Sequence, residues 1–530
     1  MAFTSINFLI FALAAMILYY CVPLNWRWLV LLVASYAFYL ISSPKTFVFI
    51  LATTIVTFFG GKQIGAYNST YKAYMDEHKK ELSSQERKAA KAANQKKKRK
   101  IVAIVLIIDF GILAVLKYFR YYLQAMGLFD TGMLLIPLGI SFYTFQSAAY
   151  IIDLYRSKMD ADTNIAKFAL FTSFFPQIIQ GPIPRHNELA KQLYEGHRFE
   201  FNNLTSGAQL VLWGFFKKLI IADRIAIPCA QIFDNYTDYS GGIVFASFVF
   251  YTIQIYADFS GGIDIARGVA KCLGINMPLN FMRPYFAESL SEFWRRWHMS
   301  LSFWCRDYIF YPIAISKFFG RLGTSLRKTL GNHVGQLFPV IVAQFATFIT
   351  IGIWHGAEFK YVAYGLYNGT IIVLGLLLEP LFVKWAEKLH INRRSNGWKY
   401  FGIVRTFVIV SFGRAFPKAA SFSVAVSMII SVFRPGHGPS FADAIMDIGM
   451  SDIDYMILIG ACIVWFLISL YEEKYFKKNG GDGTESFREM LGNKPATLRW
   501  TILLLGFAAV LALGVYGPGY DASAFIYRGF

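Results

Sequence analysis

Apolar runs recur along the whole chain, and polar residues gather in the stretches between them. Several of these runs come close to the ~20 residues that a helix needs to cross a bilayer. They lie at residues 6–22, 26–42, 46–65, 101–118, 134–152, 205–222, 242–258, 337–354, 361–380, 401–416, 453–471 and 499–516. The pattern predicts an all-α polytopic membrane protein, with roughly a dozen transmembrane helices in a single integral-membrane domain over residues 1–530.

One polar stretch, residues 279–312, interrupts this pattern although apolar sequence surrounds it. Its ionisable side chains include Glu292, Arg295, Arg296, His298, Arg306 and Asp307. Charge in such a place needs partners or water, which makes the stretch a candidate functional site. We expect a loop at membrane depth here rather than a spanning helix.

Three shorter stretches also depart from a plain apolar helix. Residues 137–156 begin with proline and glycine and carry a polar stripe, and residues 174–185 hold three prolines and a glycine, which rules out a straight helix. In residues 256–267, Gly261 and Gly262 permit either a tight turn or a close approach of helices. Irregular backbone at membrane depth must be buried in protein or line a cavity. The polar side chains of interest are Tyr143, Gln146, Gln180, Arg185, Ser260 and Asp264.

Composition supports a membrane protein. Only 16% of the residues are charged and 55% are hydrophobic, against about 25% charged in an ordinary soluble domain. The formal net charge of +19 raises the question of nucleic acid, but the basic residues lie between the apolar runs rather than on one soluble face. Positive-inside bias is the simpler explanation, and we expect no nucleic-acid partner.

The densest basic segment, residues 66–100, fixes the expected orientation. It ends in the run Lys96-Lys97-Lys98-Arg99-Lys100, and its composition favours helix. We place it in the cytoplasm, resting on anionic lipid headgroups. Three crossings precede it, so the N-terminus is expected outside the cell, and further helices over residues 400–530 form a C-terminal extension. The five cysteines show no C-x-x-C spacing, so neither a metal site nor a disulfide framework is indicated.

Two histidines carry the candidate chemistry. His298 and His355 each follow a tryptophan, Trp297 and Trp354, in or beside apolar sequence. Imidazole titrates near neutral pH and can take a proton from an alcohol and return it later. A single histidine in an apolar run is more often a packed core residue, and two in matching contexts weaken that interpretation relative to acid–base chemistry. The neighbouring arginines either anchor an acidic substrate or pair with local carboxylates, and pairing is the simpler reading.

The order of these motifs resembles a known family. Residues 293–302, Phe-Trp-Arg-Arg-Trp-His-Met-Ser-Leu-Ser, followed by Arg306-Asp307-Tyr308 and by Gly352-Ile-Trp-His-Gly356, are similar to the membrane-bound O-acyltransferase (MBOAT) family. The match is to its bacterial branch of alginate O-acetyltransferase-like and teichoic-acid D-alanylation (DltB-like) proteins. Residues 137–156, 180–185, 258–264 and 280–285 extend the likeness in the same order. Gly262 and residues 311–317 depart from the branch's usual pattern, which leaves the acceptor open.

The resemblance implies a fold and a set of roles. It implies an MBOAT-type ring of helices with re-entrant segments around a central tunnel, in which an acyl thioester from the cytoplasm meets an acceptor on the outer side. His355 matches the family's essential membrane-embedded histidine and His298 its second conserved position. His355 would act as the base, while His298 or a nearby donor would stabilise the oxyanion. The substrate-binding or tunnel-lining candidates are Trp297, Trp354, Arg295, Arg296, Arg306, Asp307, Gln180, Arg185, Ser260, Asp264, Tyr143 and Gln146.

The expected function is O-acetylation of an exported or cell-surface polysaccharide by a multi-pass protein of the bacterial inner membrane. Acetyl-CoA or another acyl thioester would be the donor, with no permanently bound cofactor. An extracytoplasmic partner resembling SGNH hydrolases would complete transfer to the sugar. Two alternatives stay open at this point: D-alanyl transfer from a carrier-protein thioester to teichoic acid, and a lipid or sugar transporter without acyl chemistry.

Overall fold

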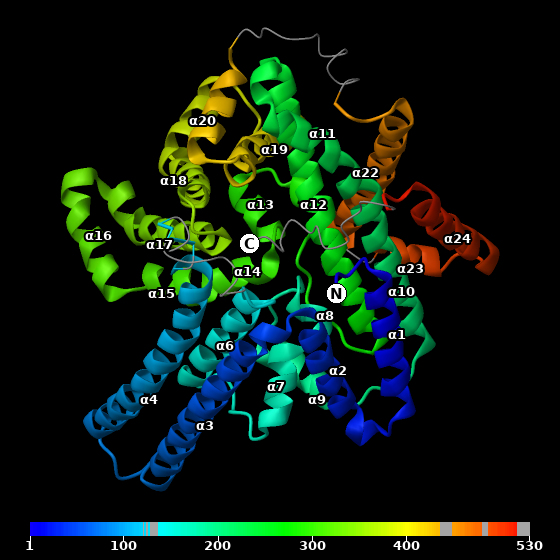
Figure 1. Cartoon of the computed structure of the whole chain (residues 1–530). Coiled ribbons are helices and arrows are strands. Elements are labelled where there is room, and N and C mark those ends of the chain that lie inside the picture. The colour runs from blue at the N-terminus through cyan, green and yellow to red at the C-terminus, as the bar shows by residue number, and fades with distance from the viewer. Residues whose placement is uncertain (120, 123–125, 128–135, 435–447, 480–485, 517–530) are drawn as a thin grey trace. The chain divides into compact units, whose positions relative to one another are not determined.

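The computed structural model describes residues 1–119, 121–122, 126–127, 136–434, 448–479 and 486–516, and the regular structure in these residues is helical (Figure 1). Eight helical segments are long and apolar enough to cross a membrane. They are Leu24–Ser42, Pro44–Glu77, Ser84–Phe119, Gly241–Cys272, Asn332–His355, Phe359–Lys388, Asp452–Lys478 and Ala496–Leu513. An all-α polytopic membrane protein is therefore confirmed.

The other apolar runs also form helix, but these helices are shorter or more polar. They are α1 (Ile6–Cys21), α6 (Ile140–Tyr155), α10 (Phe201–Phe215), which continues into a π-helical turn at Phe216–Ala222, and α19 (Asn396–Lys418). The run expected at residues 134–152 begins in part outside the described residues. Fourteen of the sixteen residues of α6 are buried, so its polar stripe faces protein rather than lipid, as predicted.

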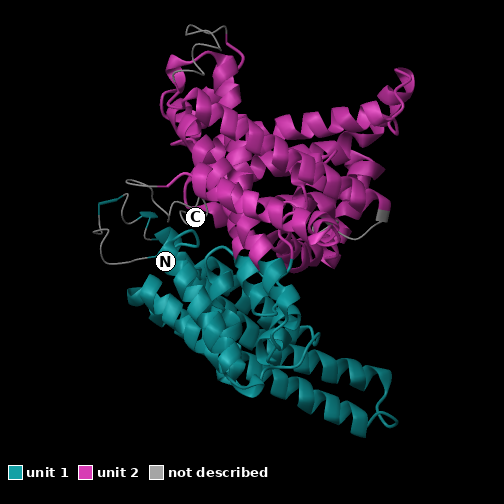
Figure 2. Ribbon diagram, turned by 90° about the vertical axis from the view of Figure 1, so that its right-hand side faces the viewer, with its two compact units in different colours: residues 1–207, 266–278 teal, residues 208–265, 279–530 magenta. Residues whose placement is uncertain are grey.

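The chain divides into two compact units (Figure 2). Unit 1 comprises residues 1–207 and 266–278, and unit 2 comprises residues 208–265 and 279–530. That the whole chain acts as a single integral-membrane domain stays a prediction. Helices α10 and α12 (Gly241–Cys272) each contribute to both units.

Unit 1 contains a long helical hairpin, α3 (Phe47–Glu77) and α4 (Ser84–Leu113). The basic segment expected as a cytoplasmic loop is therefore mostly helix. A capping box starts α4: the Ser83 hydroxyl accepts from the Glu86 N–H, and the Glu86 carboxylate accepts from the Ser83 N–H. The remaining helices of this unit are α1, α2 (Arg27–Ser42), α6, α7 (Ile165–Ser173), α8 (Phe175–Ile178) and α9 (His186–Tyr194). The break between α7 and α9 confirms that residues 174–185 are not a straight helix.

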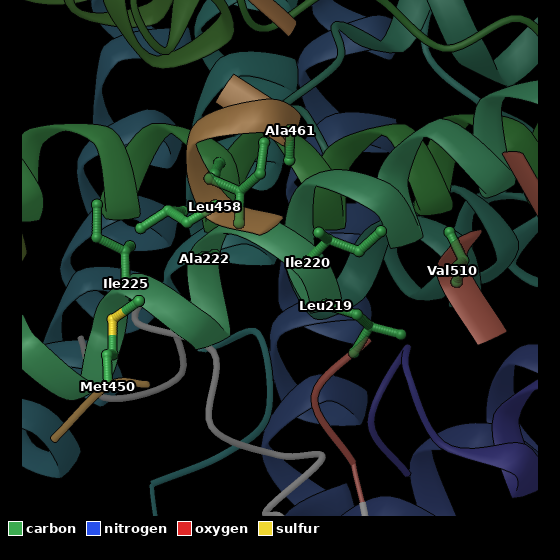
Figure 3. Close-up of a cluster of buried hydrophobic side chains, with 10 residues drawn as sticks. Leu219, Ile220, Ala222, Ile225, Met450, Leu458, Ala461 and Val510 are labelled. Atoms are coloured by element: carbon green, nitrogen blue, oxygen red, sulfur yellow. The ribbon is translucent and has the colours of Figure 1, made fainter. Parts of the chain in front are cut away.

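Unit 2 holds the helices α11 (Asp223–Asp234), α16 (Lys317–Leu330), α17 (Asn332–His355), α18 (Phe359–Lys388), α20 (Phe422–Ser431), α22 (Asp452–Asn479), α23 (Ser486–Gly492) and α24 (Ala496–Leu513), together with α19. An apolar cluster joins the π-helical turn and α11 to α22 and α24 (Figure 3). Its buried members include Ile220, Ile225, Leu458 and Val510. Burial of these apolar side chains stabilises the packing of α22 against the other helices of unit 2.

The stretch 279–312 lies in unit 2 and is a chain of short pieces, as predicted. It contains a 3₁₀ turn at Pro284–Phe286, α13 (Leu290–Arg296), α14 (Met299–Cys305), a π-helical turn at Arg306–Phe310 and α15 (Tyr311–Ala314). By contrast, residues 472–479, which follow the apolar run at residues 453–471, continue α22 as helix. In this continuation of the helix, Glu473 is buried and paired with Arg283 and Arg296.

Candidate active site

His355 is the last residue of α17, and small residues set its position. A Cβ at Gly365 of α18 would collide with the carbonyl oxygen of Phe348, and one at Gly352 of α17 would crowd the carbonyl oxygen of Tyr361. These glycines therefore let the two helix backbones approach closely. The buried His355 ring lies beside the rings of Tyr361 and Tyr364, with centroids 6.4 and 5.8 Å away.

His298 is positioned differently, in a turn between α13 and α14. Its φ of 44° lies in the left-handed region, which is unusual for a residue other than glycine. The His298 Nδ1 lies 3.1 Å from Asn280 Oδ1, and the same oxygen accepts from the N–H and the hydroxyl of Ser300. The side chain of His298 is 1% exposed.

These contacts fix the protonation pattern of His298. A backbone N–H can only donate, so the Asn280 atom it meets is the oxygen, and His298 Nδ1 must then carry a proton. The lone pair is left on Nε2. Burial lowers the pKa of His298 to about 3, so the ring is neutral at physiological pH. A ring in this state accepts a hydrogen bond or a proton through Nε2.

The structure brings the two Trp-His motifs together around one indole. The ring centroid of Trp354 lies 4.8 Å from that of His355 and 5.6 Å from that of His298. Phe259 of α12 also contacts His298, and their ring centroids are 4.9 Å apart. The two histidines predicted to carry the chemistry thus share one buried aromatic environment.

The second predicted tryptophan, Trp297, belongs to an aromatic core behind the histidines. It stacks on Phe293 with centroids 5.5 Å apart, and the guanidinium of Arg414 lies 4.3 Å from its ring centroid. Arg414 also donates to the hydroxyl of Tyr364 at 2.9 Å, and Tyr364 contacts His355. This buried cation, 2% exposed, links the surroundings of the two histidines. Sequence reasoning missed it, because Arg414 lies in a stretch without any local motif.

The predicted arginines of the stretch differ in their surroundings. Arg296 pairs with Glu292 at 2.6 Å, and Arg306 pairs with Asp307 at 2.9 Å. Arg295 is exposed. Pairing with local carboxylates was the simpler of the two alternatives, and the contacts of Arg296 and Arg306 bear it out.

Ser260 and Asp264 are also engaged by a partner that was not predicted. Lys217, in the π-helical turn, donates to Ser260 Oγ at 2.9 Å and to Asp264 Oδ2 at 2.7 Å. The next residue, Lys218, donates to Asp258 at 2.6 Å. Helix α12 runs straight through this region, so Gly261 serves a close helix approach and not a tight turn: a Cβ at Gly214 would lie 2.6 Å from the Gly261 carbonyl oxygen.

Four predicted residues lie in unit 1. Tyr143 and Gln146 stand on α6, Gln180 lies in the bend after α8, and Arg185 caps α9, where its N–H donates to Glu188. The Tyr143 hydroxyl is buried beside Tyr39. Both amide atoms of Gln146 and of Gln180 are buried, and no hydrogen-bonding partner for them occurs in the described part of the chain. Buried polar groups of this kind usually require a water or a ligand.

Residues 279–312 contain one cysteine, Cys305. Cys305 is buried, and burial raises the pKa of its thiol to about 12, which keeps it protonated. The described residues contain no group of three or more His, Cys, Asp or Glu side chains that could hold a metal ion.

The chain is similar to known proteins along most of its length. The sequence profile of the membrane-bound O-acyltransferase family matches residues 29–329. The chain is 28% identical over 488 residues to a probable alginate O-acetylase (AlgI) of Azotobacter vinelandii, covering 90% of this chain and 86% of that protein. It is 28% identical over 355 residues to the peptidoglycan O-acetyltransferase of Helicobacter pylori, covering 61% and 63%. It is 30% identical over 288 residues to the teichoic acid D-alanyltransferase of Bacillus subtilis, covering 52% and 67%.

Proposed function

Because the chain belongs to the membrane-bound O-acyltransferase family, we propose that it takes an acetyl or similar short acyl group from a cytoplasmic thioester and delivers it for O-acylation of an exported polysaccharide. Family membership makes it an acyltransferase and removes the support for a transporter without acyl chemistry. The relatives named for alginate and peptidoglycan O-acetylation favour an acetyl group and a polysaccharide acceptor.

One observation carries this proposal: His298 and His355 both contact the ring of Trp354 in a buried site. His355 takes the proton of the acceptor hydroxyl as its oxygen attacks the thioester carbonyl. The C–S bond then breaks, and the proton passes from His355 to the departing thiolate. The acyl group ends as an ester on the acceptor, and the donor leaves as a free thiol.

His298 has a different role from the one expected from the sequence. With its proton on Nδ1 and its lone pair on Nε2, it accepts rather than donates, so it does not supply an oxyanion's hydrogen bond. We assign it to accepting a hydrogen bond from a neighbouring hydroxyl of the acceptor, which positions the reacting hydroxyl so that its one proton points toward His355. The Asn280 Oδ1 atom accepts from His298 Nδ1 and holds the ring in this tautomer, as the third member of a base–orienter arrangement.

The donor requires a polar path, and unit 1 offers candidates for it. Gln146, Gln180 and Tyr143 present buried polar atoms, which suit the amide and thioester groups of acetyl-CoA or a carrier-protein thioester. We assign these residues to binding the donor, in a protein of the bacterial cytoplasmic membrane with its N-terminus outside. An extracytoplasmic SGNH-hydrolase-like partner would complete transfer to the sugar.

D-Alanyl transfer to teichoic acid is the second candidate. The 30% identity to the Bacillus subtilis D-alanyltransferase favours it. The chain's extension beyond the second histidine, through α19 to α24, and its alignment over 90% of its length with the alginate O-acetylase relative favour acetylation.

Mass spectrometry of cell-surface polysaccharides tests the proposal. Strains would carry the native protein, His355→Ala, or the control His333→Ala, which changes an exposed histidine at the other end of α17. We expect O-acetyl groups to disappear with His355→Ala and to persist with His333→Ala at equal expression. Acylation that survives His355→Ala would refute the mechanism, and D-alanyl esters in place of acetyl esters would select the second candidate.

A further inference from the structure

The carboxylate of Glu473, on α22, forms ion pairs with two arginines of residues 279–312, called here the His298 segment. Glu473 is 2% exposed. Arg283 donates from Nε to Glu473 Oε2 at 3.0 Å. Arg296 donates from Nη1 to Oε2 at 3.0 Å and from Nη2 to Oε1 at 3.2 Å. Bidentate, charge-assisted hydrogen bonds between buried groups combine strength with fixed geometry.

The two arginines lie where the segment folds back on itself. The Met282 N–H donates to the Arg296 carbonyl at 2.9 Å, and the Met299 N–H donates to the Asn280 carbonyl at 2.8 Å. Residues 280–283 therefore run beside residues 296–299. The Glu473 ion pairs close one end of this paired structure, and the contact between Asn280 and His298 lies at its other end.

This paired structure is strained. Arg283 has a φ of 46° and His298 a φ of 44°, both in the left-handed region. Such conformations cost free energy in residues other than glycine, and they persist only where the surroundings over-determine them. The Glu473 carboxylate supplies such a constraint at Arg283 directly and at His298 through Arg296.

The helix that carries Glu473 is itself firmly placed. Phe466 of α22 stacks on Phe286 of the segment, with centroids 5.8 Å apart, and Trp465 lies 4.8 Å from Tyr256 of α12. The apolar cluster of Figure 3 holds α22 against α11 and the π-helical turn. A rigid support of this kind transmits its position to the groups it binds.

We propose that Glu473 is a positioning residue for His298, acting through Arg283 and Arg296. Glu473 belongs to the C-terminal extension of residues 400–530, so in this proposal the extension supports the site rather than merely adding helices. The inference rests on the proposed role of His298. Removing the Glu473 charge leaves two buried guanidinium groups without this carboxylate, and the His298 turn relaxes.

The first measurement is independent of the reaction. The purified full-length protein in lipid nanodiscs would be treated with diethylpyrocarbonate, and modification of His298 and His355 measured by mass spectrometry. We expect Glu473→Gln to raise the His298 modification rate at least ~5-fold while His355 changes less than twofold. The matched control is Glu472→Gln, the same chemical change at the neighbouring residue, whose Oε2 is 3.8 Å from Arg283 Nη1. It should leave both histidines as they are.

The second measurement is O-acyl content of the cell-surface polysaccharide at matched expression. We expect Glu473→Gln to reduce it at least ~10-fold and the double variant Glu473→Gln/His298→Asn to be no worse than His298→Asn alone, because both changes act on one group. Should Glu473→Gln prevent folding, Glu473→Asp, which keeps the charge but shortens the side chain, is judged by the same criteria.

The outcomes separate the two proposals. Unchanged His298 reactivity in Glu473→Gln, or equal gains at both histidines, would overturn the positioning role. Full acylation in Glu473→Gln together with its loss in His298→Asn would also overturn it and leave the proposed function intact. Full acylation in His298→Asn would instead remove the catalytic role assigned to His298, whatever the reactivity result.

Discussion

The two Trp-His motifs look alike in the sequence, but the protein holds them in different ways. His355 ends a regular helix, and glycine contacts between α17 and α18 set its place. His298 lies in a left-handed turn between two seven-residue helices, held by Asn280 and by ion pairs that reach Glu473 on α22. One motif depends on close packing of neighbouring helices, and the other on buried polar contacts.

This difference predicts different responses to mutation. At a close helix contact, an added side-chain atom causes a steric collision, which lowers stability and activity together. Removing a hydrogen bond or ion pair that holds a catalytic side chain changes the orientation of that side chain, which can remove activity while most of the fold remains. Four changes test this distinction, from the largest expected effect to the smallest.

Gly365→Ala should have the largest effect. Its new Cβ collides with the Phe348 carbonyl oxygen, so α17 and α18 must separate, and His355 moves with them. We expect polysaccharide acylation to be abolished and stability to fall by about 3 kcal/mol, measured as a lower melting temperature in detergent. Gly375→Ala, on the same helix with no atom within 4 Å of its Cβ position, is the control. Normal acylation by Gly365→Ala would contradict the packing argument.

Asn280→Ala should reduce activity strongly with a smaller loss of stability. It removes the oxygen that accepts from His298 and Ser300, so the His298 ring loses its orientation. We expect acylation to fall by about 100-fold, as for other losses of catalytic orientation. Ser300→Ala removes only the Ser300 hydroxyl donor and should retain most activity. A similar loss in both variants would place the effect on Ser300 rather than on His298.

The buried neutral His298 should make stability fall in acid. The unfolded chain binds a proton at this residue below about pH 6.5, whereas burial lowers the folded pKa to about 3. Between these values the unfolded state binds more protons, so this contribution to stability is complete above pH 6.5 and decreases as the pH falls. At pH 5 the loss is about 2 kcal/mol. Melting curves at pH 7 and pH 5 should show a smaller acid shift for His298→Gln than for the native protein, and equal shifts would argue against a buried neutral imidazole.

Arg306→Ala should have the smallest effect. The Arg306 side chain is 46% exposed and pairs with the adjacent Asp307, and exposed pairs contribute about 0–1 kcal/mol. We expect acylation within about twofold of the native level and a melting temperature close to native. A tenfold loss without destabilisation would show that Arg306 contacts a substrate.

Much of the architecture could be predicted from the sequence, because hydrophobic patterning is a local property. The helical membrane fold, the break at residues 174–185 and the short pieces of residues 279–312 all follow from the spacing of apolar, proline and charged residues. The runs near residues 6–22, 205–222 and 401–416 looked like spans but form shorter or more polar helices. Apolarity alone does not distinguish a residue facing lipid from one buried in protein.

The sequence by itself identified the candidate residues: the pair of Trp-His motifs and the carboxylates and arginines beside them. Only the tertiary structure decided their partners. Lys217 joins Ser260 and Asp264, and Glu473, 175 residues beyond His298, anchors the turn that holds it. The hydrogen bond to Asn280 gave His298 an acceptor's role. Charge pairing within a protein depends on distance in space, and a buried charge takes whichever partner the fold brings within reach.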